Sequence, residues 1–297
     1  MWKYYLFRLA DFLLGWLPLP ILYGIARTAG DGAYRWRGET RDAVASNMRH
    51  LLGPGAGEDE VQRATREVFR NAGRYYADLI HLRRLDVKRF YNERYEIEGE
   101  EYLHAAKDSG RGAVLVGTHF GNPEMSVQPL AAKGLFVLGL SEPLEPKALS
   151  DFIHRLRGRN GHTYRTLGYA GLKEVIRHLK SGGLVAVLLD RDVAGRGAPM
   201  QFCGAEASIP LGAIDLAIRT GADLIAARSW RTPDYGFKVI VEPPLEIVQT
   251  GDLDADLRST AKQLFPIFEQ QLRSDPGQWA VLESIWKEQP AQEGAVQ

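Results

Sequence analysis

Cysteine is almost missing from this sequence of 297 residues, which holds a single one, Cys203. One cysteine cannot form a disulfide within the chain, so the fold must be stabilised by packing and is compatible with a reducing compartment. Hydrophobic residues make up 45% of the chain and charged residues 25%. That composition provides enough apolar surface for a substantial core, and it excludes a disordered chain and a small disulfide scaffold.

An excess of charge is also lacking, because 37 Lys and Arg residues balance 37 Asp and Glu residues. Such a chain is not built to coat nucleic acid, and we expect no nucleic-acid partner. The balance is uneven along the chain: residues 1–90 hold 15 basic and 10 acidic residues, a net charge of +5, which leaves −5 for the remainder. The amino-terminal part is therefore expected to face something anionic.

No apolar run is long enough to span a bilayer. The longest, residues 12–26 (FLLGWLPLPILYGIA), would extend only about 22 Å as a helix, whereas a hydrocarbon core is roughly 30 Å thick. Pro18 and Pro20 would also interrupt a straight helix. Aromatic residues among Leu and Phe, with basic residues around them, are typical of an interfacial segment. We therefore predict that residues 1–29 form an interfacial membrane anchor; a buried core helix broken at Pro18 is the alternative.

A helix with a basic face is predicted for residues 60–82. Apolar residues recur there at intervals of three and four, which indicates one buried helical face. The polar face carries Arg63, Arg66, Arg70 and Arg74. Two interpretations are open: a solvated face, or a face that contacts lipid headgroups beside the apolar amino terminus.

From residue 112 onward, short β-rich runs alternate with helical stretches. The runs lie at residues 112–118, 135–140, 184–190, 223–229 and 238–242, and the helical stretches include 172–179 and 211–219. Continuous apolar strands that alternate with helices favour a mostly parallel sheet covered on both faces. The predicted fold class is α/β: a mostly parallel central sheet flanked by helices, with an α-helical, membrane-associating amino-terminal region.

The chain shows no internal repeat and no long Gly-, Ser- or Pro-rich linker. We therefore expect a single α/β domain over residues 30–287, with a helical amino-terminal part. Residues 255–273 have an amphipathic helical pattern that Pro266 is expected to kink. Residues 288–297 are predicted to be a polar tail.

The sequence HFGNPEM follows directly on the first β-rich run, and ligands bind at such strand ends in doubly wound sheets. His119 is the first residue after that run. Asn122 and Pro123 form a good helix start, an N-cap followed by proline at the first helical position. Glu124 would lie in the first turn and could fold back to the His119 ring, fixing its tautomer and stabilising the imidazolium. The alternative is a histidine satisfied by backbone groups and a glutamate favoured only by the helix dipole.

The spacing between histidine and acid is a weak signal by itself. The chain holds a second pair with the same spacing, His81 and Asp86, which lies at the end of the predicted basic helix with no strand before it. We interpret the second pair as coincidental. The first is interpreted as functional because His119 follows a strand and has Gly117 and Gly121 around it.

Asp190, Arg191 and Asp192 stand at the end of the run 184–190, so they reach the same edge of the sheet as His119. Two carboxylates at this spacing could hold a metal ion. The arginine between them and the lack of further clustered ligands favour an internal ion pair that shapes the site.

Several blocks of the sequence, taken in order, resemble one family. The segment THFGNPEM resembles the His-x4-Asp/Glu block of lipid acyltransferases. Later blocks match in the same order: Glu142-Pro143, FIHRLRGRNG at 152–161, LLDRDVAGRG at 188–197 and DPGQWAVLESIW at 275–286. The ordered set covers most of residues 1–287 and resembles the lipid A biosynthesis acyltransferase superfamily, particularly its phosphatidylinositol mannoside acyltransferase branch. Cys203 departs from the pattern, because an aromatic residue is usual at that position.

The resemblance implies transfer of a fatty acyl chain from a thioester, acyl-CoA or acyl carrier protein, to a hydroxyl of a membrane glycolipid. It implies a peripheral or monotopic protein on the cytoplasmic face of the plasma (inner) membrane, acting at the membrane surface. No cofactor and no metal are expected.

In this chemistry His119 would be the general base for the acceptor hydroxyl, with Glu124 orienting it and no covalent acyl-enzyme. By resemblance, Arg157 would be an active-site cation near the thioester or headgroup, a role that suits a planar guanidinium. A surface arginine beside Arg155 and Arg159 is the alternative. The other residues expected to bind substrate are Glu142, Asp190, Arg191 and Asp192.

Two other functions are open. A non-catalytic lipid-binding or lipid-transfer protein could use the same scaffold, although it does not need a base at a strand end. A hydrolase could use the same His and Glu pair on a thioester. The chain has no Gly-x-Ser-x-Gly elbow, which disfavours the hydrolase.

Overall fold

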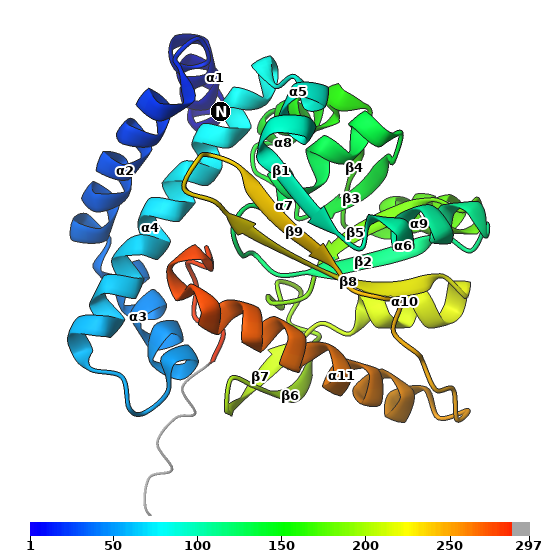
Figure 1. The fold of residues 1–297 in the computed structure, drawn as a ribbon. Coiled ribbons are helices and arrows are strands. Elements are labelled where there is room, and N and C mark those ends of the chain that lie inside the picture. Colours follow the sequence, from blue (N-terminus) through cyan, green and yellow to red (C-terminus); the bar gives the residue numbers. More distant parts are fainter. Residues whose placement is uncertain (287–297) are drawn as a thin grey trace, which may run out of the picture.

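The central element is a seven-stranded sheet. The computed structural model describes residues 1–286, so the predicted polar tail at 288–297 lies outside the described residues. The strands are β1 (Tyr95–Glu98), β2 (Ala113–Gly117), β3 (Val137–Ser141), β4 (Thr163–Thr166), β5 (Leu184–Leu188), β8 (Asp223–Arg231) and β9 (Phe237–Val241), in the order β1-β9-β8-β2-β5-β3-β4. Neighbouring strands pair in parallel except β8 and β9. The prediction of a mostly parallel α/β sheet is confirmed (Figure 1).

Helices cover both faces of the sheet. On one face, called the α6 face, Leu115 of β2 packs with α6 (Glu100–Asp108), α7 (Pro123–Val127) and α8 (Lys147–Arg157). On the other, called the α10 face, Val114 and Val116 pack with α9 (Tyr169–Lys180), α10 (Gly212–Thr220) and α11 (Leu253–Ser274). Successive side chains of a strand point to opposite faces, so a strand buried on both sides is apolar throughout. This explains why β2 reads as the continuous run AVLVG.

A layer of helices precedes the sheet in the chain. It comprises α1 (Trp2–Leu14), α2 (Leu19–Trp36), α3 (Gly38–Leu52) and α4 (Glu58–His81), and α5 (Val87–Arg94) then leads into β1. Short 3₁₀ turns are η1 (Leu82–Arg84), η2 (Gln128–Lys133), η3 (Gly158–Asn160) and η4 (Pro276–Gln278). The break between α1 and α2 falls at Pro18, as the prolines predict.

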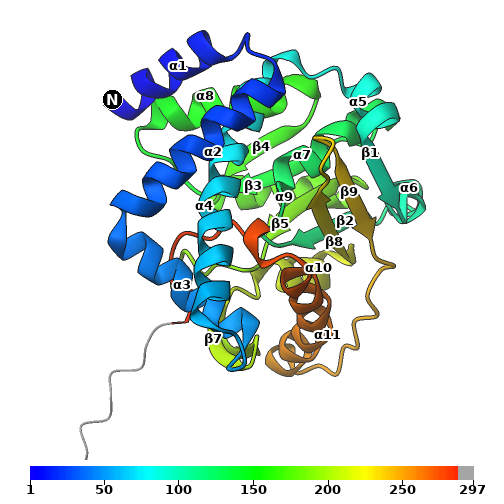
Figure 2. The same cartoon turned by 60° about the vertical axis from the view of Figure 1, so that its left-hand side comes forward.

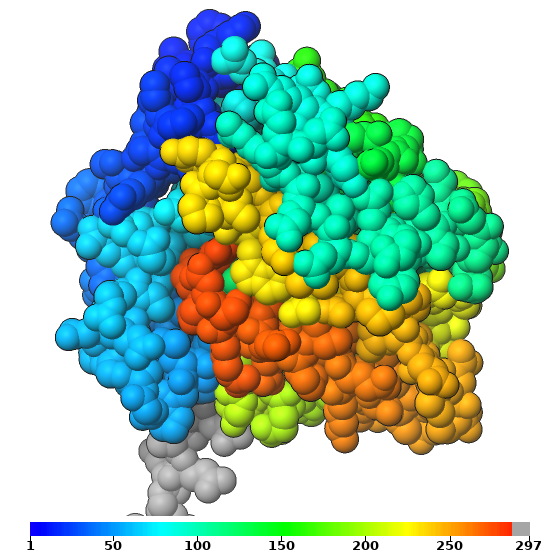
Figure 3. Space-filling view, viewed as in Figure 1, coloured from blue at the N-terminus to red at the C-terminus, as the bar shows by residue number. Residues whose placement is uncertain are grey.

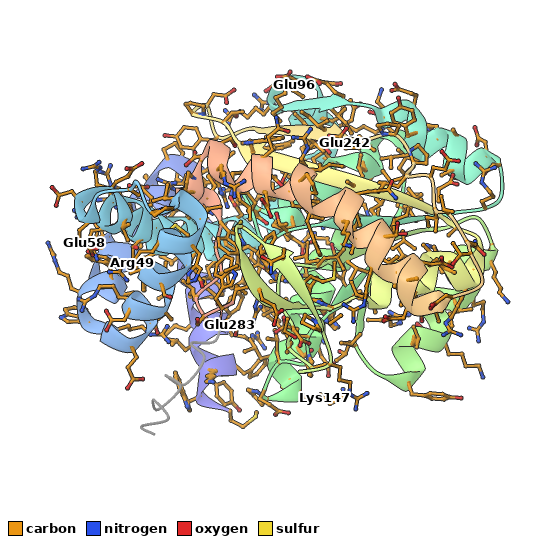
Figure 4. The ribbon with its side chains drawn as sticks, turned by 90° about the horizontal axis from the view of Figure 1, so that it is seen from below. Arg49, Glu58, Glu96, Lys147, Glu242 and Glu283 are labelled. Atoms are coloured by element: carbon orange, nitrogen blue, oxygen red, sulfur yellow. The ribbon has the colours of Figure 1, made fainter. Side chains whose placement is uncertain are left out.

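Arg49 of α3 lies 3.0 Å from Glu58 of α4, and this ion pair joins the two helices (Figure 4). No helix within residues 1–286 is both long and apolar enough to cross a membrane.

The α2 and α4 helices lie side by side (Figure 2). Their contact shows what two of the four arginines on the basic face of α4 do. Arg66 and Arg70 of α4 both pair with Asp31 of α2, with Nε to Oδ1 distances of 2.8 and 2.7 Å. The helices approach closely because Gly73 has no side chain: a Cβ there would lie 2.5 Å from the carbonyl oxygen of Ala26. These two arginines therefore hold α2 against α4, which is neither of the two predicted roles.

The structure adds strands that the hydrophobic pattern did not indicate. Both β1 and β4 are short and lie at the edges of the sheet, where polar side chains are tolerated. The strands β6 (Ala198–Phe202) and β7 (Ala205–Ile209) form a separate antiparallel hairpin. Its two-residue turn requires positive φ at both positions, which Cys203 (50°) and Gly204 (83°) adopt. The α11 helix continues through Pro266.

Candidate active site

The carboxyl ends of β2 and β5 bring two polar residues together. The strands pair in parallel with Gly117 opposite Leu188. The residues two positions further along, His119 and Asp190, are therefore neighbours as well. Nδ1 of His119 lies 2.7 Å from Oδ1 of Asp190, and the backbone N–H of His119 donates to Oδ2 at 2.8 Å. The pair stands at the edge of the sheet where the sequence predicts a site.

Asp190 is buried and strongly hydrogen-bonded. Trp279, which follows η4, donates from Nε1 to Oδ2 of Asp190 at 2.8 Å. Burial disfavours the charged carboxylate, but the His119 ring and the hydrogen bonds outweigh it and hold the pKa of Asp190 below its ordinary value. An ionised Asp190 that accepts from Nδ1–H fixes the tautomer in which Nε2 of His119 can accept a proton.

The carboxylate against Nδ1 of His119 is therefore Asp190, and not Glu124 as the sequence analysis expected. The predicted cap is confirmed, since Oδ1 of Asn122 accepts from the backbone N–H of Glu124 at 3.0 Å. From this first turn of α7 the Glu124 side chain reaches α8, where Nε of Arg157 lies 2.8 Å from Glu124 Oε2. The partner of Glu124 is therefore the permanently charged guanidinium of Arg157 and not the imidazole of His119.

Glu124 and Arg157 belong to a second buried group, called the Glu124 cluster: Glu124, Arg157, Tyr75, Tyr164 and Gln128. Tyr164 donates to Oε1 of Glu124, and Gln128 donates to the same oxygen at 2.9 Å. Arg157 donates from Nη2 to the hydroxyl of Tyr75. Burial disfavours the charged guanidinium, but Tyr75, Glu124 and Tyr164 outweigh it and raise the pKa of Arg157. Arg157 is therefore a fixed positive charge inside the protein.

Burial distinguishes Arg157 from the arginines on either side of it. Its side chain is only 13% exposed, and it lines the central cavity. Arg155 instead lies over the ring of Phe152, and neither Arg155 nor Arg159 lines the cavity. Arg157 is therefore an interior residue, and the alternative of a surface arginine is wrong.

Arg191 forms an ion pair, but with partners other than the flanking aspartates. Its Nη1 lies 2.9 Å from Glu142, and its Nε lies 2.7 Å from Glu283. Asp192 turns back towards the β6–β7 hairpin, where it accepts from the hydroxyl of Ser208 at 2.7 Å. No three His, Cys, Asp or Glu side chains within residues 1–286 converge as metal ligands would.

One continuous cavity of about 1120 Å³ joins these groups, and most of its lining is apolar. Its lining includes His119 and side chains from both faces of the sheet. On the α6 face these are Leu103, Leu115, Leu130, Val137, Val239 and Val241. On the α10 face they are Leu172, Ile176, Val187, Gly212, Ala213 and Leu216. Such a lining suits hydrocarbon, with few polar groups to fix orientation.

A buried ion pair that the sequence analysis missed holds the loop after His119. Nη2 of Arg231 in β8 lies 2.5 Å from Oδ2 of Asp78 in α4. Asp78 accepts from Nδ2 of Asn122 at 2.7 Å, and Arg231 donates from Nε to the carbonyl of Gly121 at 3.1 Å. These residues come from distant parts of the chain, so no local pattern signals them. The sequence analysis also did not assign Tyr75, Tyr164 and Trp279 to the site. They too are far in the sequence from the residues that they contact there.

The second pair of histidine and acid serves local structure. Oδ1 of Asp86 caps α5 by accepting from the backbone N–H groups of Lys88 and Arg89 at 3.1 and 3.0 Å. A cap of this kind needs no histidine. This agrees with the interpretation of His81 and Asp86 as a coincidence.

The fold and the site define an α/β enzyme in which an acid-supported histidine faces a large apolar cavity. The chain belongs to the bacterial lipid A biosynthesis acyltransferase family, whose sequence profile matches residues 1–288. The predicted resemblance is confirmed, and the protein is an acyltransferase of lipid biosynthesis.

Individual relatives fall in two groups. The chain is 26% identical to the phosphatidylinositol mannoside acyltransferase of Mycobacterium tuberculosis over 284 residues, which is 92% of this chain and 86% of the relative. It is 23% identical to the lipid A biosynthesis palmitoleoyltransferase of Escherichia coli over 294 residues, 94% of this chain and 89% of the relative. The lipid A biosynthesis lauroyltransferase of Escherichia coli is 26% identical over 282 residues, 92% and 88% of the two chains.

Proposed function

We propose that this protein is a membrane-surface O-acyltransferase that moves a fatty acyl chain from a thioester donor, acyl-CoA or acyl carrier protein, to a hydroxyl of a glycolipid. The observation that carries the proposal is His119, which lines the apolar cavity while the ionised Asp190 holds its Nδ1. The relatives named for phosphatidylinositol mannoside and for lipid A support a glycolipid acceptor.

The geometry supports a direct transfer. Nε2 of His119 takes the proton of the acceptor hydroxyl as its oxygen attacks the thioester carbonyl. The tetrahedral intermediate collapses with cleavage of the C–S bond, and the departing thiolate takes the proton from Nε2. The products are an ester and a free thiol. Asp190 remains ionised and stabilises the imidazolium between the two steps.

The Glu124 cluster has a different proposed role. Glu124 compensates the charge of Arg157, and together they fix the cavity wall beside the His119 loop. A guanidinium in this position can stabilise negative charge on a headgroup or on the thioester oxygen. Glu142, Arg191 and Asp192 also line the cavity, where we propose that they contact the polar part of a substrate.

The α1 helix supports a membrane-surface location. Asp11 is its only buried residue and pairs with Arg83 at 3.0 Å. Most of its large apolar side chains are exposed: Trp2, Tyr5, Leu6, Leu9, Phe12 and Leu13, followed by Trp16. In Figure 3 this helix lies at the edge of the molecule. Apolar and aromatic side chains gathered in this way suit headgroup depth. We propose that residues 1–29 anchor the protein peripherally on the cytoplasmic face of the inner membrane.

One incubation separates the competing functions. Purified protein receives radiolabelled palmitoyl-CoA, or the same chain on an acyl carrier protein, with and without extracted glycolipid. Labelled acyl-lipid supports the proposal, labelled free fatty acid in both mixtures indicates a thioester hydrolase, and bound but unconverted label indicates a lipid-binding protein. His104→Ala is the matched control for a His119→Ala variant in this assay, because His104 pairs with Glu100 (3.2 Å) outside the cavity. His104→Ala should transfer at the wild-type rate.

Liposome sedimentation tests the anchor. Leu9→Glu with Phe12→Glu places charge on the exposed side of α1 and should release the protein from anionic liposomes without changing its unfolding temperature. Trp36→Glu, at a residue that is 86% exposed on α2, is the control and should leave sedimentation unchanged. Equal sedimentation of all three proteins would place the membrane contact elsewhere.

A further inference from the structure

The loop that carries His119 is held by three other parts of the chain. The N–H of Gly121 donates to the carbonyl of Gln278 in η4 at 2.9 Å. The carbonyl of Gly121 accepts from Nδ2 of Asn71 in α4 at 3.2 Å, in addition to Nε of Arg231 in β8. Neither Gln278, Asn71 nor Arg231 lines the cavity. The position of the His119 ring therefore depends on side chains that stand behind the site.

A residue of the proposed anchor completes this support. Tyr23 lies in α2, and its hydroxyl donates to Oδ1 of Asp78 at 2.6 Å and accepts from Nη1 of Arg231 at 2.7 Å. The same pair of charged residues binds Asn122 and Gly121 in the loop. One oxygen atom of the anchor segment therefore contacts both members of the ion pair that positions the loop.

The hydroxyl of Tyr23 is enclosed among charged groups. The side chains of Arg231 and Asp78 are only 7% and 3% exposed. Burial and the negative charge of Asp78 raise the pKa of Tyr23 despite the nearby Arg231, so the residue stays a neutral hydroxyl that can donate. Without this hydroxyl, a buried carboxylate and a buried guanidinium would each lose a hydrogen bond that water cannot easily replace.

The same turn of α2 presents apolar side chains outward. Ile21 and Ile25 are 50% and 41% exposed, and they stand two residues before and two residues after Tyr23. An α-helix turns by about 100° per residue, so residues two apart stand on nearly opposite sides of it. This turn therefore offers one side to a bilayer and directs the other to the support of the His119 loop.

We infer that Tyr23 is a positioning residue for His119, so that the anchor segment has a role in catalysis separate from its role in membrane binding. The contact passes from Tyr23 to the pair of Asp78 and Arg231, and from this pair to the loop. The inference rests on the proposed function, because that function makes His119 the base. It follows that membrane binding and turnover can each be lost without the other.

Tyr23→Phe is the test variant, because it keeps the aromatic ring against Tyr235 and removes only the hydroxyl. Tyr34→Phe is the matched control. Tyr34 also lies in α2, and its hydroxyl donates to Oε1 of Gln62 in α4 at 2.8 Å, away from the loop. Each variant removes one hydroxyl between the same two helices, so a difference between them reports the connection to the His119 loop.

Nuclear magnetic resonance measures the environment of His119 without any need for turnover. The full-length protein is labelled with isotope-enriched histidine, and the Nδ1–H proton that His119 donates to Asp190 is assigned by its loss in His119→Ala. We expect the same resonance in wild type and Tyr34→Phe, and a shifted or exchange-broadened resonance in Tyr23→Phe. An unchanged resonance in Tyr23→Phe would overturn the inference.

A milder replacement of Tyr23 keeps the inference testable if Tyr23→Phe does not fold. Fluorotyrosine incorporated at this position retains the hydroxyl, but the fluorine weakens the oxygen as an acceptor from Arg231. A smaller change of the same His119 resonance is expected. Its absence would then overturn the inference.

Kinetics and sedimentation show whether the two roles are separate. In Tyr23→Phe, kcat for transfer from palmitoyl-CoA to extracted glycolipid in detergent micelles should fall about tenfold, because the base is displaced, while KM for palmitoyl-CoA changes by less than about twofold. Its sedimentation with anionic liposomes should equal that of wild type. Leu9→Glu with Phe12→Glu should give the reverse result, with weak sedimentation and wild-type kcat in the micelles.

The two measurements also separate this inference from the proposed function. If the His119 resonance changes in Tyr23→Phe but wild type transfers nothing to glycolipid, the proposed function fails and the positioning of the ring by Tyr23 stands. If wild type transfers and Tyr23→Phe keeps full kcat, the inference fails and the proposed function stands.

Discussion

Two buried carboxylates stand beside the His119 loop, and their partners differ in one respect. Asp190 faces the ring of His119, which becomes positive only when it takes a proton. Glu124 faces the guanidinium of Arg157, which is positive at all times. The first arrangement changes its charge during a proton transfer, and the second does not. We therefore propose that the His119–Asp190 pair transfers the proton and that the Glu124 cluster supplies a fixed electrostatic field.

The largest expected effect tests the proton-transfer half of this comparison. His119→Ala removes the base, and Asp190→Asn removes the charge that stabilises its imidazolium. Each should lower kcat/KM for acyl transfer by about 10² to 10⁴, the usual cost of losing general-base catalysis. Steady-state kinetics and thermal unfolding of the purified variants measure the effect. A folded Asp190→Asn variant with wild-type kcat/KM would break the comparison and return Glu124 to consideration as the partner of His119.

The next effect concerns stability. Glu124→Gln leaves Arg157 buried without its counter-charge, which should cost about 3 to 5 kcal/mol in the free energy of unfolding. Urea denaturation measures this cost. Adding Arg157→Met to Glu124→Gln removes the unpaired charge and should recover part of the loss.

The control for the Glu124→Gln and Arg157→Met variants is an ion pair on the surface. Glu93→Gln breaks the contact of Glu93 with Arg89 on the surface of α5, and it should be nearly silent. A similarly silent Glu124→Gln would show that the cluster does not hold the cavity wall.

The sequence predicted the sheet, the strand-end position of His119 and the Asn122 cap, because each depends on a local pattern or on the general rule for strand ends. It also placed Asp190 at the correct edge. The partner of His119 was assigned wrongly because the sequence does not give the strand order: β5 lies next to β2 although 66 residues separate the last residue of β2, Gly117, from the first residue of β5, Leu184. The ordered sheet makes Asp190 the neighbour of His119, and the cap directs Glu124 to α8 instead.

Trp279 allows a finer test of the first pair. Trp279→Phe keeps an aromatic ring in the core and removes one donor to Asp190, so the pKa of Asp190 should rise and kcat/KM should fall by about tenfold. Rates measured against pH should show the acidic limb moving to higher pH, since the carboxylate is then protonated more easily.

Trp286→Phe is the matched control for this variant. Trp286 is also a buried tryptophan, but its Nε1 donates to the carbonyl of Phe202 rather than to the site. An equal loss of kcat/KM in both variants would show that Trp279 acts through packing and not through its hydrogen bond to Asp190.

The smallest expected effect lies behind the Glu124 cluster, at His162. Its Nδ1 accepts from the backbone N–H of Val137 at 3.1 Å, and its Nε2 donates to the carbonyl of Gln128 at 3.3 Å, so the buried ring is neutral. Burial lowers the pKa of His162 despite the hydrogen bond to Gln128. The unfolded chain therefore binds more protons than the folded one once the pH falls below the ordinary histidine pKa of about 6.5, and stability declines as the pH falls from there towards the lower folded pKa. His162→Gln can keep both hydrogen bonds and cannot titrate, so its unfolding temperature should fall less than that of wild type on acidification through this range. An unchanged pH dependence would mean that His162 does not couple protons to folding, and acid sensitivity would have to be sought at the other buried histidines.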